Sequence, residues 1–257
     1  MNLSRISVIA QNVFREVIRD RVLYLGGAFA VFLLLANRIL PEIATIAADK
    51  IFLDLGLATI AVMGLLVTIF VGTGLINKEI EKKTVIVLLS KPISRSELIV
   101  GKHLGLSGVI AVLIAAMTLL YMAVLELTDI SYSPTAILLT NGFLILQLSL
   151  IVAIAIVFGV STSSLLATLL TFGTFLVGQF SQDLVRLIEL TKNPDLQRLA
   201  KYLYLILPDL SRLNYRDLAV YNALPDSLTL AMNAGYGVIY TILLLTIATF
   251  IFSRRQF

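Results

Sequence analysis

The chain has 257 residues, of which 58% are hydrophobic and only 14% are charged, and its formal net charge is +4. Soluble domains usually carry about 25% charged residues, and a soluble body of this size lacks the core volume to hide so much apolar surface. The composition therefore excludes a soluble enzyme and predicts an integral membrane protein. The absence of cysteine excludes a disulfide framework and a thiol nucleophile, and the single histidine argues against a His-rich metal site.

The first segment, residues 3–20, has the pattern of an amphipathic helix rather than of a membrane span. Its apolar side chains share one face, and Arg5, Arg15 and Arg19 lie on the opposite face. We interpret residues 1–21 as a cytoplasmic elbow helix that lies flat in the membrane interface, with these arginines toward headgroups and water. The alternative is a helix in water that packs on the cytoplasmic loop of the same chain.

Long runs without charged residues predict the membrane spans, because about 20 apolar residues are needed to cross about 30 Å of hydrocarbon. The run over residues 130–182 is long enough for two spans, and we place the break in the hydroxyl-rich sequence of residues 159–164. Residues 22–257 are thus predicted to form a single all-α transmembrane domain of six helices. The predicted spans are residues 22–40, 55–77, 103–125, 137–159, 163–181 and 229–253.

Basic residues gather in three segments that six spans would place on one side of the membrane. These segments are the N-terminal helix, residues 77–102 and the C-terminal end. The positive-inside rule predicts that this side is the cytoplasm, with both termini cytoplasmic in the plasma (inner) membrane. The outer loop of residues 181–226 is predicted to carry short amphipathic helices, which either cap a pathway or pack on the spans.

Several kinds of chemistry are missing from the sequence. It contains no G-x-x-x-x-G-K-[ST] sequence, so this chain does not bind ATP in the P-loop manner. The apolar runs contain no acidic or basic residue, which argues against a proton-coupled transporter or a charged-ring ion filter. Their polar residues are mostly small and favour close helix packing. His103 falls where the third span meets the cytoplasm, and we interpret it as an interfacial polar cap.

The segment between the second and third spans, residues 77–102, is dense in charge at both ends and apolar in the middle. Its apolar centre is too short to span a membrane and suits docking into a groove of a partner protein. Pro92 ends this short helix. Ser94 and Glu97 then have the spacing of a capping box, which predicts a second helix running through Lys102 into the third span.

This segment resembles the cytoplasmic coupling loop of type-2 ABC exporter permeases. Their pattern is an acidic pair, Gly-Thr, an apolar stretch ending in Leu-Ser-x-Pro, then Arg, Glu and Gly-Lys, and Lys83 stands where the glycine is usual. Within the family, the chain is most similar to the subgroup that includes the permease of the nitrous-oxide reductase maturation transporter. The positions to which the resemblance assigns contact with an ATPase are Glu79, Glu81, Lys83, Thr84, Leu88, Leu89, Pro92, Arg95, Glu97 and Lys102.

The resemblance implies the permease subunit of an ATP-binding-cassette exporter, in which two copies pair around a pathway. A separate cytoplasmic ABC ATPase subunit would grip residues 77–102 and supply the energy, while this chain would have no catalytic, metal or cofactor site. The expected partners are that ATPase, a second permease copy and membrane lipids, with no nucleic acid. The alternatives are a membrane scaffold or assembly protein without transport activity, and an intramembrane lipid enzyme, for which the spans lack convergent acids and histidines. The substrate stays open, as does the choice between homodimer and heterodimer.

Overall fold

The computed structural model describes residues 2–19, 24–43, 47–81, 94–181, 183, 195, 197–198 and 207–254, with the backbone alone over residues 75–81. Across this part of the chain every regular element is helical, which confirms the predicted all-α class. The elements in chain order are α1 (Leu3–Val17), α2 (Tyr24–Ile43), α3 (Ala48–Glu81), α5 (Arg95–Leu127), α6 (Pro134–Ser161), α7 (Ser164–Gln179), the 3₁₀ helix η2 (Leu210–Leu213), α10 (Arg216–Val220) and α11 (Ser227–Arg254).

Five of these helices, α2, α3, α5, α6 and α11, are long and apolar enough to cross a membrane. The predicted fifth span, α7, is apolar but has only 16 residues. At 1.5 Å per residue it covers about 24 Å, which is less than the thickness of the hydrocarbon layer. The chain is therefore a multi-pass helical membrane protein, and a sixth crossing by α7 stays a prediction.

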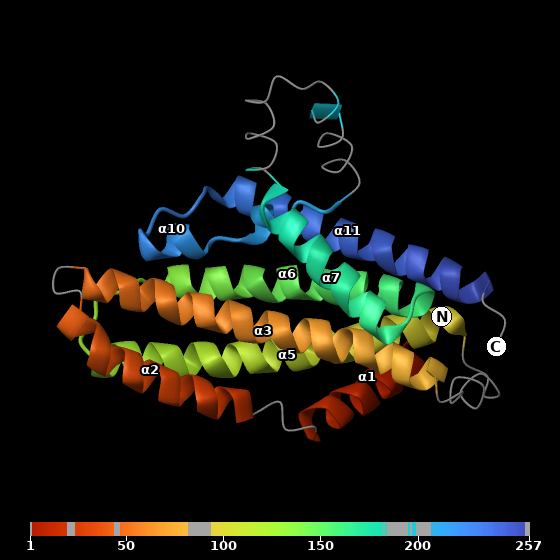
Figure 1. Ribbon diagram of the computed structural model, residues 1–257, viewed down its shortest axis with the longest axis horizontal. Coiled ribbons are helices and arrows are strands. Elements are labelled where there is room, and N and C mark those ends of the chain that lie inside the picture. Colours follow the sequence, from red (N-terminus) through yellow and green to blue (C-terminus); the bar gives the residue numbers. More distant parts are fainter. Residues whose placement is uncertain are drawn as a thin grey trace.

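The helices run back and forth along one direction, so the molecule has two distinct ends (Figure 1). We call the end that carries both termini the terminal end; the end of α3, the start of α5 and the α6–α7 turn also lie there. The opposite, distal end carries the α2–α3 and α5–α6 connections and α10. The described parts of the three basic segments, which are α1, the helical flanks of residues 77–102 and the end of α11, thus lie at one end of the bundle.

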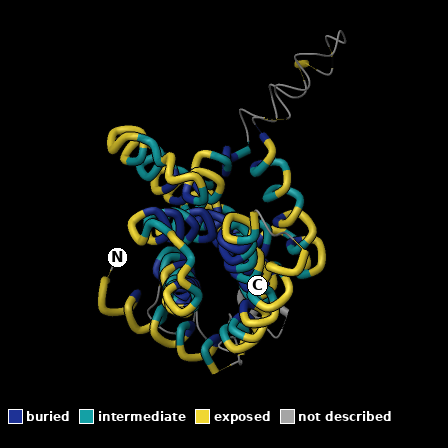
Figure 2. Tube along the Cα trace, turned by 90° about the vertical axis from the view of Figure 1, so that its left-hand side faces the viewer, coloured by how far each residue is buried: buried dark blue, intermediate teal, exposed yellow. Residues whose placement is uncertain are grey.

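The central element is α6, which packs against α3, α5, α7 and α11. Every side chain from Leu150 to Ile156 is buried, as expected for a helix that is apolar on all sides. The outward faces of the surrounding helices expose large apolar side chains, including Leu119, Leu165 and Ile239 (Figure 2). Such surfaces are stable only in a nonpolar solvent, which agrees with a bilayer around the bundle.

The local signals in the sequence place several helix ends correctly. The capping box at Ser94 and Glu97 is present, and α5 continues from it without interruption through Lys102 to Leu127. The predicted break in the long apolar run is also present, since α6 ends at Ser161 and α7 begins at Ser164.

The second long helix begins at Ala48, before the predicted span of residues 55–77, because the charges at Asp49, Lys50 and Asp54 mark the edge of the apolar run and not the end of the helix. The bounds of the span itself stay a prediction. One sequence interpretation is wrong. His103 is no interfacial cap: it is 5% exposed, and its Nε2 lies 3.0 Å from the carbonyl oxygen of Ser149 on α6. The α5–α6 contact covers it.

Candidate functional site

The residues predicted to contact an ATPase fall into three groups. Glu79 and Glu81 lie in the last turns of α3, and Arg95, Glu97 and Lys102 lie in the first turns of α5. Lys83, Thr84, Leu88, Leu89 and Pro92 lie outside the described residues. The structure therefore describes where the predicted coupling loop leaves the bundle and where it re-enters, and contact with a partner stays a prediction.

The re-entry point is fixed by one buried carboxylate that serves two helix starts. Glu97 is 4% exposed, and its Oε2 accepts from the backbone N–H of Ser94 at 3.0 Å, which closes the cap of α5. Its Oε1 accepts from the backbone N–H of Asn2, the N-cap residue of α1, at 2.7 Å. A negative charge next to two helix N-termini is favourable, because both present unpaired N–H groups. An arginine on α1 adds to this, since Arg5 Nη1 lies 3.9 Å from Oε2.

In the turns of α5 that follow Glu97, α1 packs directly on a face of α5 that contains glycines. A Cβ at Gly105 would sit 2.6 Å from the carbonyl oxygen of Ala10, and one at Gly101 would sit 2.7 Å from Cγ2 of Ile9. Glycine at these positions lets the two helices approach closely, as small residues do in membrane-protein packing. The two glycines and the carboxylate therefore hold α1 on α5.

The apolar face of α1 is thus used largely within the chain. Ile6, Val13 and Val17 are buried, whereas all three arginines predicted for the membrane interface, Arg5, Arg15 and Arg19, are exposed. Among the described residues, the partner of this face is α5. The location of α1 at a membrane surface stays a prediction.

Arg95 ties the same point to the last helix. Its guanidinium donates to the carbonyl oxygens of Phe252 at 2.7 Å and Ser253 at 2.5 Å. These carbonyls belong to the C-terminal turn of α11, where a cation is favourable. The first three residues of α5 therefore join α5 to both α1 and α11.

The distal half of the bundle holds a cavity of about 420 Å³ between α3, α6 and α7. Its apolar wall includes Leu57 and Leu65 of α3, and its polar wall includes Asn141 and Gln147 of α6. The segment from Ser211 to Asp217, which contains η2 and the start of α10, forms its rim. A volume of this size is within the usual range of small-molecule pockets, roughly 300–1,000 Å³.

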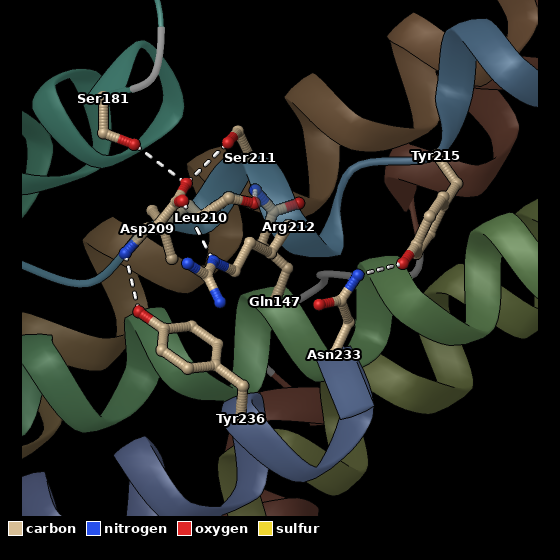
Figure 3. A network of polar contacts seen from close by, with 9 residues as sticks. All are labelled: Gln147, Ser181, Asp209, Leu210, Ser211, Arg212, Tyr215, Asn233 and Tyr236. Atoms are coloured by element: carbon tan, nitrogen blue, oxygen red, sulfur yellow. Dashed lines mark hydrogen bonds and ion pairs between the residues drawn. The ribbon is translucent and has the colours of Figure 1, made fainter. Parts of the chain in front are cut away.

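The far end of α7 is held by a polar network around Asp209 (Figure 3). Its Oδ1 accepts from the hydroxyls of Ser181 at 2.8 Å and Ser211 at 2.5 Å, and its Oδ2 lies 3.1 Å from Nε of Arg212. Its backbone N–H donates to the hydroxyl oxygen of Tyr236 on α11 at 2.8 Å. This carboxylate, 4% exposed, thus binds α7, the segment before η2 and α11 into one unit.

Sequence reasoning missed both the cavity and this network. The predictions made from the sequence assign no role to residues 207–211, although an aspartate between apolar residues is itself a sign of a buried polar contact. Among the described residues, no group of three or more His, Cys, Asp or Glu is placed to hold a metal ion.

A comparison with protein families connects these features to known proteins. A family described as ABC-2 family transporter protein matches residues 7–257, from α1 to the C-terminal end. A comparison with curated proteins found no match. The matched range includes Arg95, Glu97 and every residue that lines the distal cavity, whereas Asn2 and Arg5 precede it.

Proposed function

The chain belongs to the ABC-2 transporter family, as a membrane permease subunit, and on that premise we propose that two copies form the pathway of an exporter driven through residues 77–102. Membrane subunits of this family typically lack ATPase activity, so the proposal assigns ATP hydrolysis to a separate cytoplasmic subunit. Within the family, we also propose that the chain belongs to the subgroup that includes the permease of the nitrous-oxide reductase maturation transporter.

The observation that carries the coupling proposal is the junction after the loop. A force applied to residues 82–93 would act on Ser94 and then on the first turn of α5. In that turn, Arg95 is hydrogen-bonded to α11 and Glu97 to the N-cap residue of α1. From there α5 runs as one helix of 33 residues that contains no proline. A continuous helix transmits displacement along its axis, because its backbone hydrogen bonds resist bending. The loop is therefore well placed to move three helices together.

The charge distribution supports a cytoplasmic location for this junction. The basic N-terminal helix, the basic flanks of the loop and Arg254 at the end of α11 all belong to the terminal end. The positive-inside rule places such an end in the cytoplasm, where an ATPase has access to ATP. On the other flank of the loop, Glu79 and Glu81 lie in the last turns of α3, and the proposal assigns them a role in orienting that partner.

Co-purification with the cognate ABC ATPase tests the coupling proposal. The double substitution Leu88→Asp/Leu89→Asp puts charge into the apolar centre of the loop, and we expect it to abolish complex formation and the stimulation of ATP hydrolysis. The matched control is Leu127→Asp/Leu228→Asp at the distal end, where the two leucines are 83% and 67% exposed. An unchanged complex with unchanged hydrolysis in the loop variant would refute the coupling role and favour the scaffold alternative. The mass of the intact complex tests the pairing of two copies.

A further inference from the structure

One wall of the distal cavity contains an amide without a hydrogen-bond partner among the described residues. Asn141 is 3% exposed, and neither its Nδ2 nor its Oδ1 makes a hydrogen bond to this part of the chain. Its polar neighbours on α6 do have partners: Thr140 donates to the carbonyl oxygen of Tyr215 at 3.4 Å, and Gln147 donates to Oε1 of Gln179 at 2.8 Å. Buried polar groups in native proteins are almost always paired, with protein or with water, because an unpaired one is costly. The amide is therefore suited to bind a group that enters the cavity, either water or a ligand with donors and acceptors.

The cavity is continuous with an apolar outer surface. Figure 1 shows α7 crossing α3 obliquely, and the hydroxyls of Thr73 and Thr168, 2.9 Å apart, join the two helices toward the terminal end. Farther along, the lining includes Val62 of α3 and Phe180 after α7, which are 54% and 52% exposed. An apolar chain lying against these side chains would extend from the cavity to the lipid-facing surface.

The rim of the cavity carries both signs of charge. Arg216 and Asp217 line it, and Nε of Arg216 forms ion pairs with Oδ1 of Asp54 at 3.1 Å and with Oδ1 of Asp217 at 3.5 Å. Asp183 also lines the cavity. A cationic group would match these acids, of which Asp217 has a side chain that is 77% exposed, and the Arg216 guanidinium offers a positive charge to an anionic oxygen. A headgroup with both charges therefore finds a partner for each of them.

We propose that this cavity binds a zwitterionic amphiphile, with its headgroup at Arg216 and Asp217, a polar linkage near Asn141 and its apolar chain between α3 and α7. The proposal rests on the permease function, because it names the substrate class of that permease.

The absence of cysteine in the sequence allows a direct binding test. Bimane attached to the variant Val62→Cys reports on the cavity, and bimane on Ile239→Cys, at a position of α11 that is 69% exposed, reports on ordinary contact with lipid. Each protein is placed in nanodiscs of phosphatidylglycerol and titrated with nitroxide-labelled lysophosphatidylcholine. We expect saturable quenching at position 62 and quenching merely proportional to concentration at position 239. Proportional quenching at both positions overturns the proposal.

The substitution Asn141→Leu separates a ligand-binding role from a structural one. It removes the unpaired amide, so we expect the apparent dissociation constant of the lysolipid to rise at least tenfold while the melting midpoint stays equal or increases. The control Thr118→Val removes a buried hydroxyl of α5 that bonds only within its own helix, and it should leave binding unchanged. Binding by Asn141→Leu at the original affinity overturns the role of the amide.

Competition identifies the chemical class. Unlabelled lysophosphatidylcholine should displace the probe, whereas lysophosphatidylglycerol, which lacks the positive charge, and glycerophosphocholine, which lacks the chain, should not. Equal displacement by either of the last two overturns the zwitterionic or the amphiphilic part of the proposal. These measurements need no ATPase, so a failure of the loop experiment and a failure of ligand binding are distinguishable.

Discussion

The seam between α1 and α5 makes a prediction in which neighbouring glycines respond in opposite directions. At Gly105, an added Cβ would lie 2.6 Å from the backbone oxygen of Ala10 and 2.8 Å from Cβ of Val13. At Gly108, one turn further along, the nearest atom is the Phe14 ring carbon Cδ2 at 3.6 Å, an ordinary contact. Replacing either glycine by alanine changes the same chemical group on the same helix.

The expected magnitudes follow from two opposing effects. Overpacking costs typically about 1–3 kcal/mol, and alanine in place of glycine within a helix returns about 1 kcal/mol. For Gly105→Ala the obstructing atom is a backbone oxygen, which moves only if α1 moves, so the overpacking cost should lie in the upper part of that range, about 2–3 kcal/mol. After the gain of about 1 kcal/mol, we expect a net loss of about 1–2 kcal/mol. For Gly108→Ala only the gain remains, about 1 kcal/mol. For a chain of this size the melting midpoint should fall by roughly 2–8 °C in the first variant and rise by about 2–4 °C in the second.

Far-UV circular dichroism of the protein in nanodiscs measures these midpoints. A single scan rate is needed, because membrane proteins commonly unfold irreversibly. Trypsin cleavage at Arg15, which is exposed on α1, provides a second readout, and it should accelerate in Gly105→Ala alone. If Gly105→Ala melts at or above the midpoint of Gly108→Ala, α1 does not lie on α5 as described and the terminal-end junction is wrong.

Three further predictions concern polar groups at the two ends. Arg95→Gln removes the cation from the carbonyl end of α11 and should speed hydrogen exchange in its last turn, while Arg15→Gln, at an exposed position of α1, should leave exchange in α11 unchanged. Asp209→Asn leaves donors of its network unmatched and should cost about 2 kcal/mol in thermal unfolding, whereas the exposed Asp129→Asn should cost nothing measurable. A hydrogen bond from the Thr229 hydroxyl holds the pKa of Asp226 below its ordinary value of 3.8. Its stabilisation of the start of α11 is therefore complete above about pH 5 and lost as the pH falls through the lowered pKa, so Asp226→Asn should show a weaker acid dependence of the melting midpoint.

The features that the sequence predicts correctly depend on short-range rules. The capping box needs only Ser94 and Glu97, three residues apart, and it fixed the start of α5. The break before α7 needs only a hydroxyl-rich stretch in an apolar run too long for one crossing. The glycines at 101 and 105 have the spacing of four residues that is typical of close helix contacts, but the predictions made from the sequence include no contact there.

The features that escaped prediction depend on which distant residues meet. The acceptors of Arg95 lie 157 and 158 residues away in the chain, and the Asn2 that Glu97 accepts from lies 95 residues away. The charge pattern of a sequence does not distinguish a residue that binds within its own chain from one that binds another protein. The amphipathic face of α1 has the same ambiguity, because apolar side chains suit lipid and α5 equally. His103 was misplaced for this reason: its position at the end of an apolar run says nothing about α6 covering it.

The two proposed sites are connected through α3. This helix of 34 residues lines the cavity at Leu57 and Leu65 and ends at Glu81, where the loop begins. On the other flank of the loop, α5 is bound to α1 and α11, so the two flanks belong to differently anchored parts of the bundle. A partner that pulls the loop changes the position of the end of α3 relative to that three-helix unit. Because the Thr73–Thr168 contact joins α3 to α7 between the loop and the cavity, such a displacement alters the angle between these helices. That angle sets the width of the cavity, so the geometry offers a physical route by which a movement at the loop changes the affinity for a ligand at the distal end.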